Sequence, residues 1–190
     1  MSKERGAALS RKVKVIISCL AVLMLIVFSA CEKEKVQKSP RITGPCQVYD
    51  KLPAGIATPV EINYGNKIKL LGITAEKQPQ NKLKISYYWQ LMDDLGSFNT
   101  VFVHFTDKDD KGLFGNDHDF CQDRPFRELK GKFVEEPFVI DISPAAVGKE
   151  VTIKIGMYSV ESNSRLKIES SGGAPTDNDN TRAIIEKLNL

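Results

Sequence analysis

Short runs in which apolar and polar residues alternate limit most strongly what this chain can fold into. In residues 83–92, Ile85, Tyr87 and Trp89 fall on one side of an extended chain and Tyr88 falls on the other. Because successive side chains of a β-strand point to opposite faces, a period of two indicates a strand with one buried face. Similar runs occupy residues 67–74, 99–106, 133–142, 150–158, 165–168 and 183–190.

The fold expected from these runs is all-β, a single antiparallel β-sandwich of the immunoglobulin-like kind with about seven strands. Turn-forming residues separate the runs, and no long stretch keeps a helical period. The last run is ambiguous, because residues 181–188 also fit a short helix. Residues 170–180 (SSGGAPTDNDN) predict a flexible polar loop. We expect the domain to cover residues 46–190.

The first thirty residues have the layout of a secretory signal. A basic start is followed by an apolar run at residues 15–28, and the small residues Ser29 and Ala30 then lead to Cys31. This order of basic, apolar and small residues is typical of an exported protein. The apolar run is shorter than the roughly 20 residues that a spanning helix needs. We therefore expect a cleaved signal, with an uncleaved helical anchor as the alternative.

The four residues that end at Cys31 resemble a lipobox, the cleavage site of bacterial lipoproteins. Ser29, Ala30 and Cys31 match that motif, and Phe28 stands where leucine is usual. The resemblance implies a signal peptide at residues 1–30, lipid on the Cys31 sulfur and a flexible tether at residues 31–45. It places the protein in the bacterial cell envelope, anchored to a membrane, and Glu32 favours the periplasmic side of the outer membrane. The alternative is that Cys31 is an ordinary thiol.

Removal of the signal changes the charge of the chain. The complete sequence has 27 basic and 24 acidic residues, whereas residues 31–190 have 22 and 23, a net charge of −1. A near-neutral protein has no basic field for nucleic acid, so we expect no nucleic-acid partner.

The mature chain would keep two cysteines that could pair. Cys19 lies in the apolar run and Cys31 would carry lipid, which leaves Cys46 and Cys121. Export places them in an oxidising compartment, so we predict a Cys46–Cys121 disulfide. Two unpaired thiols are the alternative.

Residues 64–190 also resemble a β-sandwich module found at the C-terminus of some bacterial membrane glycosyltransferases. This resemblance implies the fold more than the function, and it suggests a carbohydrate-facing role by association only. The matching positions are Gly65, Leu70, Tyr88, Trp89, Gln90, Val103, His104, Asp107, His118, Gly156, Tyr158, Arg165 and Leu166.

Tyr88, Gln90 and His118 are the residues that could bind a ligand. Tyr88 lies opposite Tyr87 and Trp89 on its strand, where its ring could stack on a sugar, with Gln90 nearby. His118 is flanked by Asp117 and Asp119, so it could act as an acid, a base or a ligand. Ordinary packing or a structural hydrogen bond is the alternative for each, and also for His104, the other histidine.

Carboxylates are frequent, but their spacing favours plain structural roles. Asp107, Asp109 and Asp110 resemble part of a calcium loop but lack its complete spacing, so a hairpin turn is the simpler interpretation. Glu135 and Glu136 are expected to be exposed and to solvate the surface.

The leading hypothesis for function is a non-enzymatic envelope lipoprotein that binds a glycan or an envelope protein. No nucleophile motif, phosphate loop or CxxC pair is present in the sequence. We expect no cofactor. The alternatives are a hydrolase of envelope glycans that uses carboxylates and His118, and a purely structural envelope component.

Overall fold

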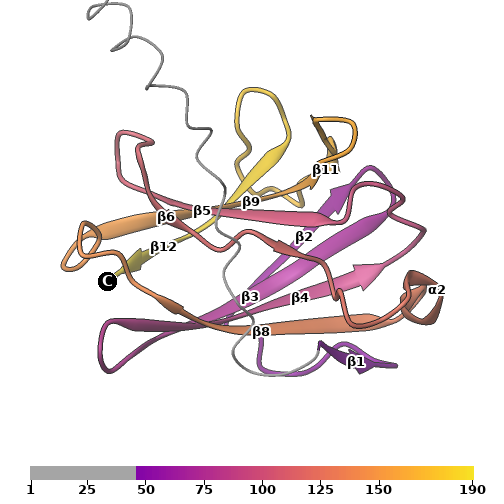
Figure 1. Ribbon diagram of the computed structural model, residues 1–190, viewed down its shortest axis with the longest axis horizontal. Coiled ribbons are helices and arrows are strands. Elements are labelled where there is room, and N and C mark those ends of the chain that lie inside the picture. The colour runs from indigo at the N-terminus through magenta and orange to yellow at the C-terminus, as the bar shows by residue number, and fades with distance from the viewer. Residues whose placement is uncertain (1–45) are drawn as a thin grey trace, which may run out of the picture. The chain divides into compact units, whose positions relative to one another are not determined.

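The computed structural model describes residues 46–190, which form two antiparallel β-sheets of six strands each (Figure 1). The expected all-β sandwich is therefore confirmed in its architecture. The first sheet contains, in spatial order, β1 (Gln47–Tyr49), β8 (Phe133–Asp141), β4 (Lys82–Leu91), β3 (Ile68–Gln78), β2 (Thr58–Tyr64) and β11 (Ile168–Ser170). Cys31, the predicted signal peptide and the predicted tether lie outside the described residues.

The second sheet is built around β9 (Glu150–Ser159), which pairs with β5 (Thr100–Thr106) along one edge. On its other edge, β9 pairs with β12 (Arg182–Asn189) over residues 150–156 and with β10 (Ser164–Arg165) beyond them. The outer edge of β5 pairs with β6 (Gly112–Gly115) and β7 (His118–Asp119). The last run of the chain is thus a strand, and the helical alternative for residues 181–188 is wrong.

Seven of the twelve strands in residues 46–190 have seven residues or more, and the other five have two to four. The expectation of about seven strands matches the number of long strands but not their identity. Residues 165–168 form no single strand, because β10 and β11 belong to different sheets. In its place β2 (Thr58–Tyr64) is a long strand that the expected runs did not include. One short helix, α2 (Phe126–Leu129), also lies in the described part of the chain.

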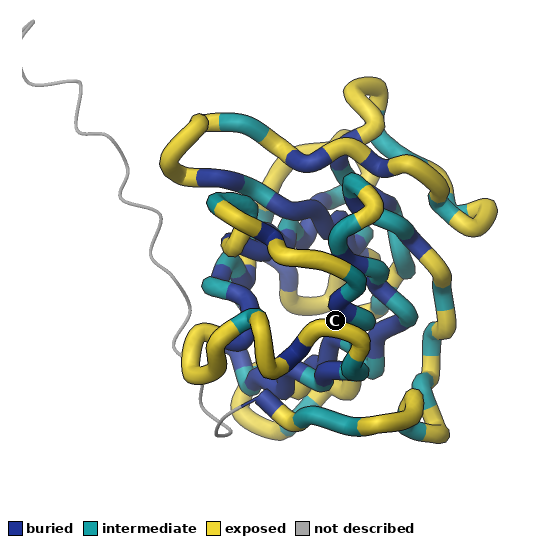
Figure 2. The backbone as a smooth tube through the Cα atoms, turned by 90° about the vertical axis from the view of Figure 1, so that its right-hand side faces the viewer, coloured by how far each residue is buried: buried dark blue, intermediate teal, exposed yellow. Residues whose placement is uncertain are grey.

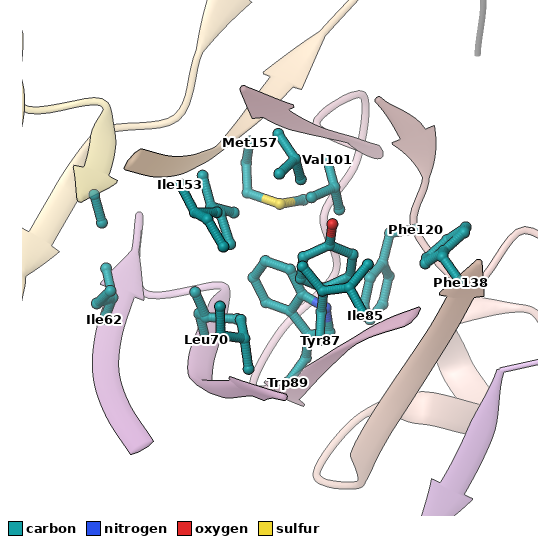
Figure 3. Packing of buried hydrophobic residues seen from close by; sticks show 14 of the residues in the cluster. Ile62, Leu70, Ile85, Tyr87, Trp89, Val101, Phe120, Phe138, Ile153 and Met157 are labelled. Atoms are coloured by element: carbon teal, nitrogen blue, oxygen red, sulfur yellow. The ribbon is translucent and has the colours of Figure 1, made fainter. Parts of the chain in front are cut away.

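The core lies between the two sheets, and each of the seven long strands contributes buried residues to it (Figure 2). Large aromatic side chains fill it, with Trp89 packed edge-on against Phe120 at 6.0 Å between ring centroids (Figure 3). The hydroxyl of Tyr64 on β2 donates to the carbonyl of Ile155 on β9 at 2.9 Å. This hydrogen bond joins the two sheets through the core and satisfies a polar group that water cannot reach.

Residues 170–180 are ordered by hydrogen bonds, although their composition predicts a flexible loop. Thr176 pairs with Ala183 across the edge of β12, and Ile184 donates its amide to Pro175. The Asp177 carboxylate accepts the amides of Thr181 and Arg182 at 2.9 and 3.1 Å. The segment therefore covers part of a sheet edge that would otherwise present free backbone groups.

No helix within residues 46–190 is both long enough and apolar enough to cross a membrane.

Candidate functional site

Tyr88 and Gln90 lie on the outer face of the first sheet, as the alternation of β4 predicts. Their neighbours Tyr87 and Trp89 are completely buried on the inner face, while Tyr88 and Gln90 are partly exposed. The strand register places Glu135 of β8 directly opposite Tyr88, and Gln47 of β1 opposite Glu135. The sequence prediction therefore placed Tyr88 and Gln90 correctly on one accessible face.

Glu135 joins two tyrosines on this face. Its carboxylate accepts a hydrogen bond from the Tyr88 hydroxyl at 3.3 Å and one from the Tyr49 hydroxyl at 3.0 Å. The Tyr49 hydroxyl also lies within hydrogen-bonding distance of the side-chain oxygen of Gln47. We call the set Gln47, Tyr49, Tyr88, Gln90 and Glu135 the Glu135 cluster.

Burial raises the pKa of both tyrosine hydroxyls, and the negative charge of Glu135 raises it further. Tyr49 and Tyr88 therefore keep their protons at neutral pH and remain donors. A carboxylate has about four acceptor sites, and the two tyrosines use two of them. The remaining sites, two amide side chains and two partly exposed rings make a surface suited to a ligand with many hydroxyl groups.

His118 lies on the other side of the first sheet from this cluster and is only 4% exposed. Its ring stacks beside Tyr87 and packs against Phe138, with centroids 5.5 and 4.3 Å away. His118 therefore does not share the outer face of Tyr88 and Gln90, and its buried contacts fit the structural alternative. The tyrosine that it meets is Tyr87, because the pairing of β7 with β5 turns the histidine inward.

Glu136 is the partner of His118, and it is completely buried. Its Oε2 atom lies 3.2 Å from Nε2 of His118, and its Oε1 atom accepts the amide of Cys121 at 2.7 Å. The expectation that Glu136 is exposed beside Glu135 is wrong. Adjacent residues of a strand face opposite ways, so one of the two glutamates had to point into the core.

The hydrogen-bond partners of His118 fix where one proton lies. Nδ1 faces the backbone carbonyl of Asn116 at 2.7 Å, and because a carbonyl only accepts, Nδ1 is the donor. Nε2 lies 3.2 Å from Oε2 of the Glu136 carboxylate. Asn116 in turn donates to the Tyr87 hydroxyl at 2.9 Å. These contacts make the His118–Glu136 pair part of a closed, buried network.

Asp117 and Asp119 do not join His118 in one site. Oδ1 of Asp117 accepts the backbone amide of Val103 at 2.9 Å, and Oδ1 of Asp119 accepts the Thr100 hydroxyl at 3.3 Å. Both contacts attach the residues around β7 to β5. The three consecutive residues therefore point at three different partners, which is not the convergence that acid–base catalysis requires.

Asp107, Asp109 and Asp110 form a turn between β5 and β6. Oδ1 of Asp107 accepts the amides of Asp109 and Lys111, each at 3.0 Å. Asp110 has a positive φ of 61° and pairs with Lys154 on β9, while Asp109 pairs with its neighbour Lys108. The carboxylates thus have separate partners, and their contacts are those of a hairpin turn.

Cys46 and Cys121 are buried with their sulfur atoms at disulfide-bonding distance and their Cα atoms 5.4 Å apart. They are separated by 75 residues. Cys46 precedes β1 and Cys121 follows β7, so the pair attaches the edge of the first sheet to the turn that leads to α2 (Figure 1). The predicted pairing agrees with this geometry.

His104 faces the outer side of the second sheet, opposite the buried Val103 and Phe105. Its Nδ1 atom lies 3.5 Å from the guanidinium of Arg182, which also pairs with Asp177 at 2.8 Å. Burial lowers the pKa of His104, and the charges of Arg182 and Arg165 lower it further. His104 is therefore a neutral partner of a structural ion pair.

Sequence reasoning missed three members of the Glu135 cluster as binding residues, namely Gln47, Tyr49 and Glu135 itself. Tyr49 lies in a strand of only three residues, which is too short to show alternation. The exposure of Glu135 could have been predicted from the sequence. Glu135 and Glu136 are adjacent in one strand, so their side chains must lie on opposite faces of the sheet.

No family model, no curated protein and no solved structure matches this chain.

Proposed function

We propose that this protein is a non-enzymatic lipoprotein of the bacterial envelope whose β-sandwich binds a glycan through the Glu135 cluster. The lipid anchor at Cys31 and the tether at residues 31–45 would hold the domain on the periplasmic side of the outer membrane. The observation that carries the binding role is the carboxylate of Glu135, which two partly exposed tyrosines flank on an open sheet face.

The chemistry of a sugar fits this surface. A sugar ring carries hydroxyl groups, which donate to a carboxylate and bond to the amide side chains of Gln47 and Gln90. Its C–H face packs against an aromatic ring, and tyrosine combines a ring with a polar end. An envelope protein is the other partner class that the sequence suggested, and it would be recognised by the same side chains.

A hydrolase that uses His118 is the rival hypothesis, with a structural component of the envelope as the third. The buried position of His118 and Glu136 argues against the hydrolase, because a catalytic acid or base must reach its substrate. We therefore assign the His118–Glu136 pair to the stability of the fold.

The immunoglobulin-like description of the sandwich is also a proposal. In its favour, the chain passes from β4 in the first sheet to β5 in the second, returns to β8 beside β4, and crosses again to β9 beside β5. Antiparallel pairs of non-consecutive strands, one pair in each of two packed sheets, are typical of the Greek-key connections of that fold.

Binding of the detergent-solubilised full chain to an array of envelope glycans tests the proposed function. Replacing Tyr88→Ala should weaken the binding about ten-fold or more, as expected when a packed aromatic contact is removed. Glu135→Gln keeps the shape of the side chain but removes its charge, and it should weaken the binding several-fold.

Tyr158→Ala is the matched control, because Tyr158 is a partly exposed tyrosine of the second sheet that bonds to Asn163. It should leave the binding unchanged. The proposal would be rejected if the unaltered chain bound neither a glycan on the array nor an envelope protein in a pull-down. Equal binding by the Tyr88 and Tyr158 variants would reject the Glu135 cluster as the site.

A further inference from the structure

A pocket of about 260 Å³ lies beside the turn that follows β7, apart from the Glu135 cluster. Asn99, which directly precedes β5, lines one side, and six residues of the segment 119–126 line the rest. A backbone hydrogen bond joins the two sides of the pocket, since the amide of Phe120 donates to the carbonyl of Asn99 at 2.7 Å. Side chains that line the pocket are Asn99, Asp119, Phe120, Gln122, Arg124 and Phe126.

Contacts of Cys121 fix the shape of the turn that lines the pocket. The amide of Cys121 donates to buried Glu136, and the carbonyl of Cys121 accepts the amide of Arg124 at 3.0 Å. The sulfur of Cys121 lies at bonding distance from that of Cys46. The turn is therefore fixed by three separate contacts, as a preformed binding site requires.

The pocket combines an aromatic floor with a polar rim. Phe120 is buried and Phe126 is partly exposed, with their ring centroids 6.3 Å apart. Asn99, Gln122 and Arg124 are exposed around them, and Asp119 is half-exposed. The charges of Asp119 and Arg124 cancel, so the pocket as a whole does not select for an ion of either sign.

We propose that this pocket binds a single pyranose ring of a neutral sugar. The C–H face of the ring would pack on Phe126. Its hydroxyl pairs would bond to the planar amide, carboxylate and guanidinium groups of the rim, which bind two neighbouring polar atoms at once. The volume is slightly below the roughly 300–1,000 Å³ of pockets for larger ligands, which suits one ring rather than several. The site is separate from the Glu135 cluster and does not depend on it.

Saturation-transfer NMR on the detergent-solubilised full chain tests the proposal, with glucose, galactose and N-acetylglucosamine as probes and glycine as a zwitterionic competitor. At least one sugar should receive saturation at its ring C–H protons, and glycine should not displace it. Arg124→Ala and Phe126→Leu should each weaken the affinity of the pocket for the sugar about ten-fold. The first variant removes a charge-assisted hydrogen bond, and the second removes the aromatic packing surface.

Arg127→Ala is the matched control, since Arg127 is also exposed and lies three residues from Arg124 outside the pocket. It should bind the sugar as the unaltered chain does. Tyr88→Ala, which removes part of the Glu135 cluster, should also leave this signal unchanged, so the two proposals can fail separately. Absence of transfer to all three sugars would overturn the proposal. Equal binding by the Arg124 and Arg127 variants, or displacement of the sugar by glycine, would overturn it as well.

Discussion

Two neighbouring glutamates differ in burial and in hydrogen-bond partners. Glu135 is partly exposed and accepts hydrogen bonds from Tyr49 and Tyr88, whereas Glu136 is buried and bonded to His118 and to the amide of Cys121. A buried carboxylate loses its hydration and is tolerated only when its acceptor sites are used. The same residue type thus lies on an open sheet face at one position and in the core at the next.

Replacing Glu136→Ala should destabilise the fold by about 3 to 5 kcal/mol, because it leaves His118 and the Cys121 amide buried without their acceptor. Glu135→Ala is the matched control and should cost less than about 1 kcal/mol, since its carboxylate is near solvent. Urea unfolding followed by tryptophan fluorescence measures both. Similar losses from the two variants would contradict the assignment.

Asp177 gives the fold a specific sensitivity to acid. Burial by itself would raise the pKa of this carboxyl, but the amides of Thr181 and Arg182 and the guanidinium of Arg182 outweigh it, so the pKa lies below its ordinary value of 3.8. A lowered pKa in the folded state adds stability above the ordinary value, and this stability is lost as the pH falls through the lowered pKa.

Asp177→Asn should therefore cost about 1 to 3 kcal/mol at pH 7, the range for a hydrogen-bonded charge with little exposure. The difference between the variant and the unaltered chain should shrink as the pH falls below about 4. Unfolding curves from pH 7 to pH 2 measure it. A difference that stays constant across this range would show that the carboxylate charge is not involved.

Part of the site was predictable from single residues and part was not. The alternation in β4 placed Tyr87 and Trp89 in the core and Tyr88 outside it. For His118 the flanking aspartates of NDHDF suggested acid–base or ligand chemistry, with a structural hydrogen bond as the alternative, and its buried contacts fit that alternative. The decisive partner, Glu136, comes from a different strand, and no local pattern reveals that contact.

At the scale of elements, long strands were predictable and short ones were not. Residues 67–74, 99–106 and 150–158 alternate clearly and correspond to β3, β5 and β9. Strands of two to four residues, such as β1 and β7, depend on pairing with a neighbour rather than on their own pattern. These short strands contain Tyr49 and His118. For this reason the Glu135 cluster and the network around Glu136 could be recognised only from the three-dimensional structure.

The Cys46–Cys121 pair should stabilise the domain by about 4 kcal/mol, the value expected for a closed loop of about 75 residues. Urea unfolding with and without a dithiol reductant measures this contribution, with the Cys46→Ala/Cys121→Ala variant as the control that no longer responds to reductant. An identical unfolding midpoint under both conditions, in the unaltered chain, would show that the two sulfurs are not bonded.

At the scale of the whole molecule, the proposed arrangement is a β-sandwich that presents a recognition face and a pocket, held at a membrane by lipid. The described domain supplies the two surfaces, and residues 1–45 would supply location. Residues 31–190 have a net charge of −1, so the proposed recognition would depend on hydrogen bonds and aromatic packing rather than on a long-range field.

Mass spectrometry of the N-terminal peptide from the bacterial membrane fraction tests the central claim, which is that the chain is a lipid-anchored envelope protein. We expect a mature chain that begins at Cys31 and carries the additional mass of a diacylglyceryl group. We further expect that Cys31→Ala abolishes this modification. A chain that retains residues 1–30, or one that begins near residue 31 without acyl mass, would contradict the claim.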